Sequence, residues 1–181
     1  QKFSEIISKT WNKLGGNALI FDGPRSTPQL SFIVRLRSLD AGVVVTASHN
    51  PFHDNGFKAY SSDGSQIAGI DAQNVIEKYN QLTWEYVCNV WNQREGEFEN
   101  KFFPKQDDIS YLQEIEESVL NLELIKSNSP KIVFTPIHGT GAISSVPAFW
   151  EIGADIKVFD EQNDFDPNFS SVKSPNPENE N

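Results

Sequence analysis

The stretch GVVVTASHNPFHDNGFKAY, residues 42–60, carries the strongest signal for the fold of this protein. Its unbroken apolar start is typical of a strand covered on both faces of a parallel sheet, so we expect a strand from Ala41 to Val45. The strand runs into a loop with the sequence TASHNP, residues 46–51. In open α/β sheets the active crevice lies beyond the carboxyl ends of the strands, so this loop is the candidate catalytic segment.

A helix, a strand and a second helix are expected before this strand. Apolar residues recur at helical spacing from Phe3 to Leu14, and Gly15–Gly16 is a suitable stop. A short buried strand from Ala18 to Phe21 follows, and then a helix that is capped by Thr27 and ends near Arg37. This alternation of helices and strands indicates the α/β class.

The region after the loop is less regular. We expect a strand from Phe57 to Tyr60 and a helix from Ala72 to Leu82, whose Val75, Ile76, Tyr79 and Leu82 face inward. The segment from Glu85 to Lys105 is interpreted as connecting structure. Ser110 and Gln113 form an S-x-x-Q capping box, which predicts the start of another helix.

The last part of the chain has the pattern of a βαβ unit. Its strands are expected at Lys131 to Thr135 and Asp155 to Phe159, with a helix from Ser144 to Ile152 between them. Two strands and one helix cannot cover both faces of a parallel sheet, so this unit is expected to be incomplete as written. We predict two domains, at residues 1–107 and 108–181.

Composition limits the partners that this protein can bind. The chain has 181 residues and a net charge of -10, which disfavours nucleic acid and anionic membranes because both need a basic surface. Cys88 is the one cysteine, and no apolar run approaches the roughly 20 residues of a membrane span. We expect a cytoplasmic protein.

Ser48 lies at the centre of the candidate loop. A triad nucleophile would need a G-x-S-x-G elbow, which TASHNP lacks. The serine could instead carry a phosphoryl group. A phosphoserine has roughly -1.5 to -2 charges at neutral pH, so a cation must offset that charge before an anionic substrate can approach.

The motifs TASHNP and NGFKAY closely resemble the phosphoserine loop of the α-D-phosphohexomutases, the phosphoglucomutase and phosphomannomutase family. The resemblance continues through FDGPRSTPQLSF, DGSQI, FTPIHGTG and VKSPNPE, so it covers most of the chain from Phe21 on. It implies two successive phosphohexomutase-type α/β domains with mixed, largely parallel sheets. The first is expected to lack its start and the second its C-terminal part.

The resemblance also implies a reaction. Ser48 would donate its phosphoryl group to a sugar monophosphate and take the other phosphate back from a bisphosphate intermediate. The implied substrates are hexose 1-phosphate and hexose 6-phosphate of glucose or mannose, with hexose 1,6-bisphosphate as activator. Mg²⁺ is the implied cofactor, bound through the phosphate of Ser48. The other metal ligands of the family are not found in this chain, so the chain alone is expected to be inactive.

Four further loop residues receive roles from the resemblance. Lys58 matches the N-G-x-K lysine, which helps to move or polarise the proton of the attacking hydroxyl; spacing alone would favour a simple strand-edge lysine. His49 is implied to be catalytic, while Thr46 and Asn50 are implied to hold the phosphate. Asn50 followed by proline also suits a turn.

Other polar residues are given structural roles. His53 is expected to be a solvated loop residue, and His138 a satisfied histidine in a tight βα turn rather than a ligand. Asp164 and Asp166 are interpreted as a solvated turn, because the metal loop of the family has the form D-x-D-x-D-R. A phosphopentomutase, a phosphoglucosamine mutase or a non-catalytic regulatory relative remain the alternatives.

Overall fold

The structure, a computed structural model, describes residues 2–93, 99–176 and 178–179. The helices are α1 (Lys2–Lys13), α2 (Thr27–Leu36), α3 (Gly69–Asn80), α4 (Trp84–Asn92), α5 (Gln106–Glu117), α6 (Leu122–Asn128) and α7 (Gly141–Glu151). The strands are β1 (Leu19–Ile20), β2 (Ala41–Val45), β3 (Phe57–Ser61), β4 (Lys101–Phe102), β5 (Lys131–Phe134) and β6 (Asp155–Val158), and Asp160–Gln162 forms a 3-10 helix. Within these ranges, no helix combines the length and the apolar character needed to cross a membrane.

The strands confirm the α/β class and form three separate pairs. β1 and β4 are parallel, β5 and β6 are parallel, and β2 and β3 form an antiparallel hairpin. The expected parallel neighbour of residues 41–45 is therefore wrong: in the described part of the chain β2 pairs with β3. Helices rather than a wide sheet contact this strand, since α2 packs on β2 and α1 reaches it as well, while Val43 stays 37% exposed.

The core of the N-terminal part lies between α2 and the hairpin. Leu30 and Val34 of α2 pack against Tyr60 of β3, and Val34 is fully buried. Gly42 of β2 lets the helix approach this closely, because a Cβ atom there would lie 2.8 Å from Cγ2 of Val34. The buried face of α2 thus determines how close β2 can lie.

We expect Gly42→Ala to destabilise the fold by about 1–3 kcal/mol, as overpacking of a filled core does. Val34 cannot move away because it is fully buried. Urea denaturation monitored by circular dichroism measures the change. Gly23→Ala is the matched control, since a Cβ at Gly23 would lie at an ordinary 3.5 Å from Nη1 of Arg25, the end of a long side chain. Equal stability of the two variants would contradict the close approach.

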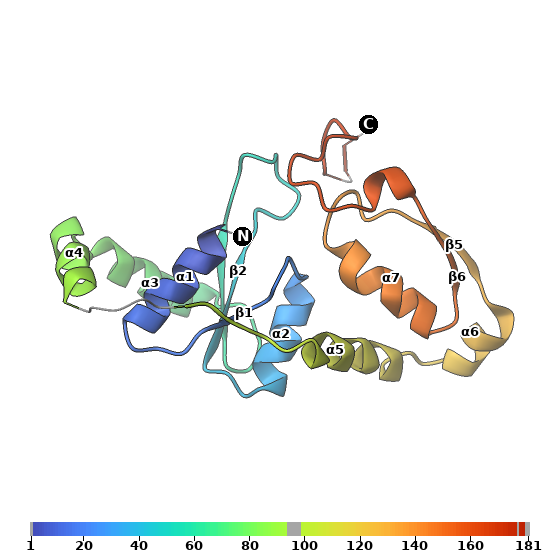
Figure 1. Cartoon of the computed structure of the whole chain (residues 1–181), viewed down its shortest axis with the longest axis horizontal. Coiled ribbons are helices and arrows are strands. Elements are labelled where there is room, and N and C mark those ends of the chain that lie inside the picture. Colours follow the sequence, from blue (N-terminus) through green and yellow to red (C-terminus); the bar gives the residue numbers. More distant parts are fainter. Residues whose placement is uncertain (1, 94–98, 177, 180–181) are drawn as a thin grey trace.

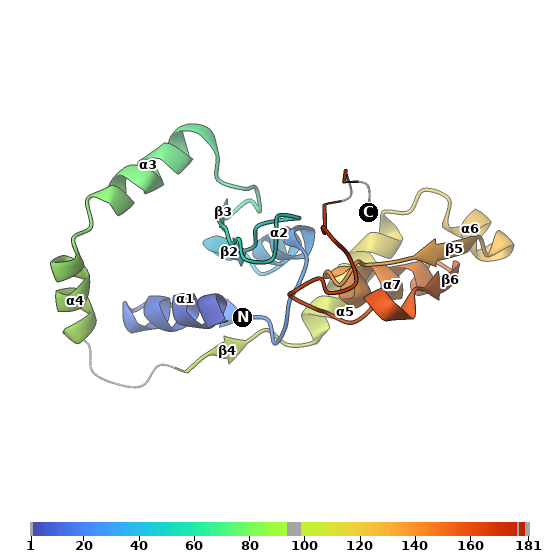
Figure 2. The same ribbon diagram turned by 90° about the horizontal axis from the view of Figure 1, so that it is seen from above.

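The helices α3 and α4 extend away from the hairpin as an arm (Figure 2). The helix predicted at 72–82 is present as α3, but the prediction that its apolar residues face inward is wrong: Val75, Ile76, Tyr79 and Leu82 are 48–71% exposed. The reason is that α3 leaves the sheet instead of packing on it. The segment 85–105 is more regular than expected, because it contains α4 and β4; its residues 94–98 lie outside the described ranges.

Two predicted helix starts are wrong. Ser26 rather than Thr27 caps α2, since its hydroxyl accepts the N–H of Gln29 at 3.4 Å. Ser110 does not open a helix, because α5 already begins at Gln106, with acidic residues in its first turn that suit the positive end of the helix dipole. The predicted domain boundary after residue 107 falls in this first turn, and it stays a prediction.

The C-terminal part forms the expected βαβ unit. β5 and β6 lie side by side, and α7 crosses between them with Phe149 against Phe134, ring centroids 5.7 Å apart. α7 starts at Gly141, three residues before the predicted start at Ser144. After β6, the described residues form the short 3-10 helix and turns, as expected from the absence of any further pattern.

Two arginine–aspartate pairs join α2 to α5, and we call these four residues the clasp. Arg25 donates from Nε and Nη2 to the two carboxylate oxygens of Asp108, both at 2.8 Å. Arg37 donates in the same way to Asp107, at 2.6 and 2.8 Å. Gln29, which is buried, adds a third donor to Asp108. Each arginine therefore forms a bidentate ion pair with its aspartate.

The Arg25 side chain lowers the pKa of Asp108, chiefly by hydrogen bonding and also by its charge. An aspartate with a lowered folded pKa adds stability above its unfolded pKa of about 3.9, and this stability is lost as pH falls through the folded value. We expect Asp108→Asn to cost about 1.5–3 kcal/mol at neutral pH and less below about pH 4. Urea denaturation at both pH values measures this. Glu117→Gln, on the exposed side of α5, should cost little at either pH. A pH-independent loss for Asp108→Asn would contradict the linkage.

Candidate active site

The candidate loop connects β2 to β3 and spans residues 46–56. The Thr46 N–H donates to the Gly56 carbonyl at 2.9 Å, which extends the hairpin by one rung. Gly56 is required at this closure, because a Cβ atom there would lie 2.6 Å from the carbonyl oxygen of Thr46. Beyond this rung the chain turns twice, through hydrogen bonds from Asn50 N to Ala47 O and from Asp54 N to Pro51 O. The loop thus projects from a closed base.

Ser48 is exposed and has a left-handed backbone, with φ of 60°. Its N–H donates to Oγ1 of Thr46 at 3.0 Å, and its hydroxyl lies 3.4 Å from Nδ1 of His49. A left-handed residue other than glycine costs on the order of 1–3 kcal/mol, and such strain concentrates at functional sites. Ser48 is the second residue of the turn that the hydrogen bond from Asn50 N to Ala47 O closes, so its left-handed backbone is part of this turn, and the residue stays exposed.

Lys58 lies at the base of the same loop. It stands opposite Val44 in the hairpin, and paired residues of an antiparallel ladder share a face. Thr46 lies two residues beyond Val44, so Lys58 and Thr46 are diagonal neighbours on the face that packs on α2. Lys58 is half-buried, and among the described residues no ion pair or hydrogen bond of its amine is present. Lys58 therefore has an unpaired amine among the described residues and lies on the strand next to Thr46, two residues before Ser48.

Of the other predicted loop residues, one lies beside Ser48 and the others contact residues of the loop. His49 is close to Ser48, as described above. Asn50 instead donates from its side chain to Asp54 at 3.2 Å, so its role in this structure is to tie the loop together. His53 is 67% exposed and lies 3.8 Å from Asp54, which confirms the solvated loop position. The predicted catalytic and phosphate-binding roles of these residues stay predictions.

The second predicted turn, around His138, is confirmed as structural. His138 is buried, its Nδ1 donates to the Asp164 carbonyl at 3.0 Å, and its Nε2 contacts the Ser171 hydroxyl at 2.7 Å. Asp166 accepts backbone N–H groups from Asn168 and Ser170, and bonds with Ser170 are the main cause that lowers its pKa to about 2. These contacts fold the C-terminal segment over the start of α7.

The loop alone does not make a magnesium site. Across the ranges that the structure describes, no three histidine, cysteine, aspartate or glutamate side chains gather where they could hold a metal ion. Mg²⁺ needs near-octahedral oxygen ligands. Among the described residues, the phosphate oxygen on Ser48 would have no carboxylate cluster beside it, so these residues alone do not fit a complete Mg²⁺ site.

The hairpin with its exposed polar loop, which contains Ser48, and the βαβ unit define a protein of the α/β class. The family model "Phosphoglucomutase/phosphomannomutase, alpha/beta/alpha domain I" matches residues 1–85, and the model for "alpha/beta/alpha domain II" matches residues 109–181. The chain belongs to the phosphohexomutase family that these models describe.

Curated relatives support this assignment. The chain is 34% identical over 180 residues to a phosphoglucomutase of Staphylococcus haemolyticus, and 34% identical over 186 residues to one of Staphylococcus aureus strain MRSA252. Each comparison covers 98% of this chain and 32% of the relative, so the chain spans about a third of the length of these relatives.

A solved structure shows the same fold. The crystal structure of a candidate phosphomannomutase from Thermus thermophilus superimposes with a TM-score of 0.72 at 21% identity, covering 94% of this chain and 36% of that one. The overall fold of this chain is therefore shared with that structure.

Proposed function

We propose that a full-length protein containing this chain is an intramolecular phosphotransferase that interconverts hexose 1-phosphate and hexose 6-phosphate. Ser48 carries the proposal, because it combines an exposed hydroxyl and a left-handed backbone with its place in the TASHNP loop after β2. Relatives named phosphoglucomutase favour glucose as the sugar, and mannose is the second candidate. The alternative mutases differ in the sugar and not in the role of Ser48, whereas in a non-catalytic relative Ser48 would carry no phosphoryl group.

In the proposed cycle, phosphorylated Ser48 donates its phosphoryl group to the sugar monophosphate. The bond between phosphorus and the Ser48 oxygen breaks, a bond to the sugar hydroxyl oxygen forms, and the hydroxyl proton ends on the Ser48 oxygen. The bisphosphate then returns its other phosphate to Ser48 by the reverse step, which restores the phosphoserine. Hexose 1,6-bisphosphate would therefore also prime unphosphorylated protein.

The residues around Ser48 have complementary roles in this proposal. Lys58, whose amine is unpaired among the described residues, would polarise the attacking hydroxyl and move its proton. His49 is 3.4 Å from the Ser48 hydroxyl and would help to hold the phosphoryl group. Thr46 fixes the Ser48 N–H and so the orientation of the loop. The proposal includes Mg²⁺ as the cofactor of the full-length protein, where it would offset the charge of the phosphoserine.

The test is to locate the phosphate after incubation with glucose 1,6-bisphosphate. We expect peptide mass mapping of the full-length protein to find one phosphate, on Ser48. Ser62, an exposed serine in the turn that follows β3, should stay unmodified. Phosphate found on Thr46 or Ser61 and not on Ser48 would overturn the proposal.

A further inference from the structure

The clasp connects the serine loop to the βαβ unit through one helix. α5 packs on α2 and also on α7. A hollow of about 390 Å³ lies between the three helices, lined by residues that include Ser26, Pro28, Tyr111, Ile115, Ser145 and Phe149. Because this space is open rather than filled, α2 and the βαβ unit are connected mainly through the contacts that each of them makes with α5.

The two pairs of the clasp approach α5 from the two ends of α2. Arg25 precedes α2 and Arg37 is its C-cap, so they are separated by the helix length of about 15 Å. Asp107 and Asp108 are consecutive in the first turn of α5 and lie about 100° apart around its axis. Rotation of α5 about its axis would therefore strain at least one of the two pairs in either direction.

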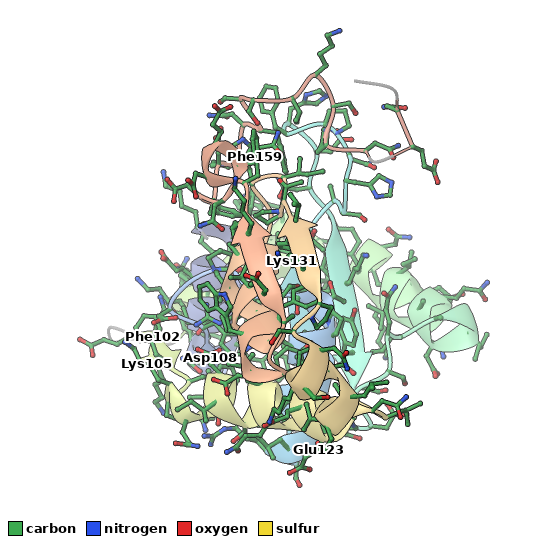
Figure 3. The ribbon with its side chains drawn as sticks, turned by 90° about the vertical axis from the view of Figure 1, so that its right-hand side faces the viewer. Phe102, Lys105, Asp108, Glu123, Lys131 and Phe159 are labelled. Carbon is green, nitrogen blue, oxygen red and sulfur yellow. The ribbon has the colours of Figure 1, made fainter. Side chains whose placement is uncertain are left out.

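Packing around the clasp supports a fixed joint. Each pair has one buried member: the side chain of Arg25 is 10% exposed and that of Asp107 is 4% exposed. The rings of Phe21 and Phe103 lie 4.6 Å apart, and each carries an arginine of the clasp on its face. One turn further along α5, the ring of Tyr111 packs against that of Phe32 of α2, with the ring centroids 5.5 Å apart. Figure 3 shows Asp108 beside Lys105 and Phe102, where β4 leads into α5.

The orientation that this joint holds is visible in Figure 1. The loop between β2 and β3 and the segment after β6 open toward the same side of the molecule. In an α/β protein this is the side on which active crevices form. We propose that the clasp is a positioning device: Arg25 and Arg37 set the rotation of α5, so that the strand ends of the βαβ unit face the side on which Ser48 is presented.

Arginine is suited to this role for a reason that can be tested. Its planar guanidinium forms two parallel bonds to a carboxylate, whereas lysine keeps the charge but makes a single-point contact. A purely electrostatic attachment would survive the change to lysine, but an orienting attachment would not. That this orientation serves catalysis at Ser48 rests on the proposed function. The role of the clasp in setting the rotation of α5 does not.

The experiment measures the distance between the hairpin region and the βαβ unit of this chain by pulsed electron paramagnetic resonance. Spin labels are attached to cysteines placed at Ser62 and Lys157, both exposed, in a Cys88→Ser background. We expect one narrow distance distribution for the parent chain. The double variant Arg25→Lys and Arg37→Lys should give a broader and displaced distribution with unchanged circular dichroism. Arg35→Lys, whose guanidinium donates to Ser31 of the same helix, should leave the distribution unchanged.

An unchanged distribution in a folded double variant would overturn the proposal, whatever the outcome for Ser48. If the double variant does not fold, the single variants Arg37→Lys and Asp108→Asn supply the same comparison, and unchanged distributions in both would overturn it as well. Locating phosphate on Ser48 does not depend on this joint, so the two proposals fail separately.

Discussion

Ser48→Ala should remove the mutase activity of the full-length protein, with a loss of at least about 10³-fold in kcat. The proposed reaction passes through a covalent phosphoserine, and alanine has no oxygen that could carry the group. Without that oxygen, residual activity would require direct transfer of the phosphoryl group from one sugar to another. A coupled assay with glucose 1-phosphate measures the loss.

The fold should tolerate this substitution. Ser48 is exposed, its N–H bond to Thr46 does not involve its side chain, and alanine keeps the same backbone donor. Ser62→Ala, which removes another exposed hydroxyl in the turn that follows β3, is the matched control and should keep full activity. A folded Ser48→Ala variant with wild-type kcat would exclude the phosphoserine mechanism and favour the interpretation of this loop as a turn.

Local patterns were sufficient to predict most of the elements near the site. The apolar run at 41–45, the strand that begins at Phe57 and the βαβ spacing are all signals within a few residues, and the structure confirms each element. The pairing of 41–45 was not predictable in the same way. A continuous apolar strand can be covered by sheet or by helices, and here α2 fits against it because Gly42 leaves room.

Long-range contacts explain what the sequence could not predict. Arg25 and Asp108 are 83 residues apart, and Arg37 and Asp107 are 70 apart, so no periodicity connects them. The two adjacent acids at the start of α5 were the available signal, but acidic residues in a first turn are also favoured by the helix dipole alone. The inward face predicted for α3 was wrong for the opposite reason, because a sound amphipathic pattern does not say what the helix packs on.

In the candidate site, the sequence identified the loop but not the conformation of its residues. The motif pointed to Ser48, and the structure adds that its backbone is left-handed and that the residue is exposed. The side chain of Asn50 was assigned to phosphate, yet here it bonds to Asp54, since a flexible amide binds the nearest carboxylate. Such choices depend on side-chain positions that spacing does not encode.

Lys58→Ala should lower kcat by about 10²- to 10⁴-fold and change KM by far less, because proton transfer to or from the attacking hydroxyl is felt mainly in the transition state. Lys58 is half-buried opposite Val44, so its loss could also weaken packing. Lys58→Met separates the two effects, because methionine keeps an unbranched apolar stem and lacks the amine. Both variants should show the same loss of kcat if the amine is responsible.

The appropriate control is a lysine in a strand without a proposed role. Lys157→Ala, on the exposed face of β6, should leave kcat and KM unchanged. Steady-state kinetics of the full-length variants, with circular dichroism to check the fold, gives the answer. If Lys58→Met keeps wild-type kcat while Lys58→Ala is unstable, the lysine serves the hairpin through its stem, and the proton must be moved by another group near Ser48.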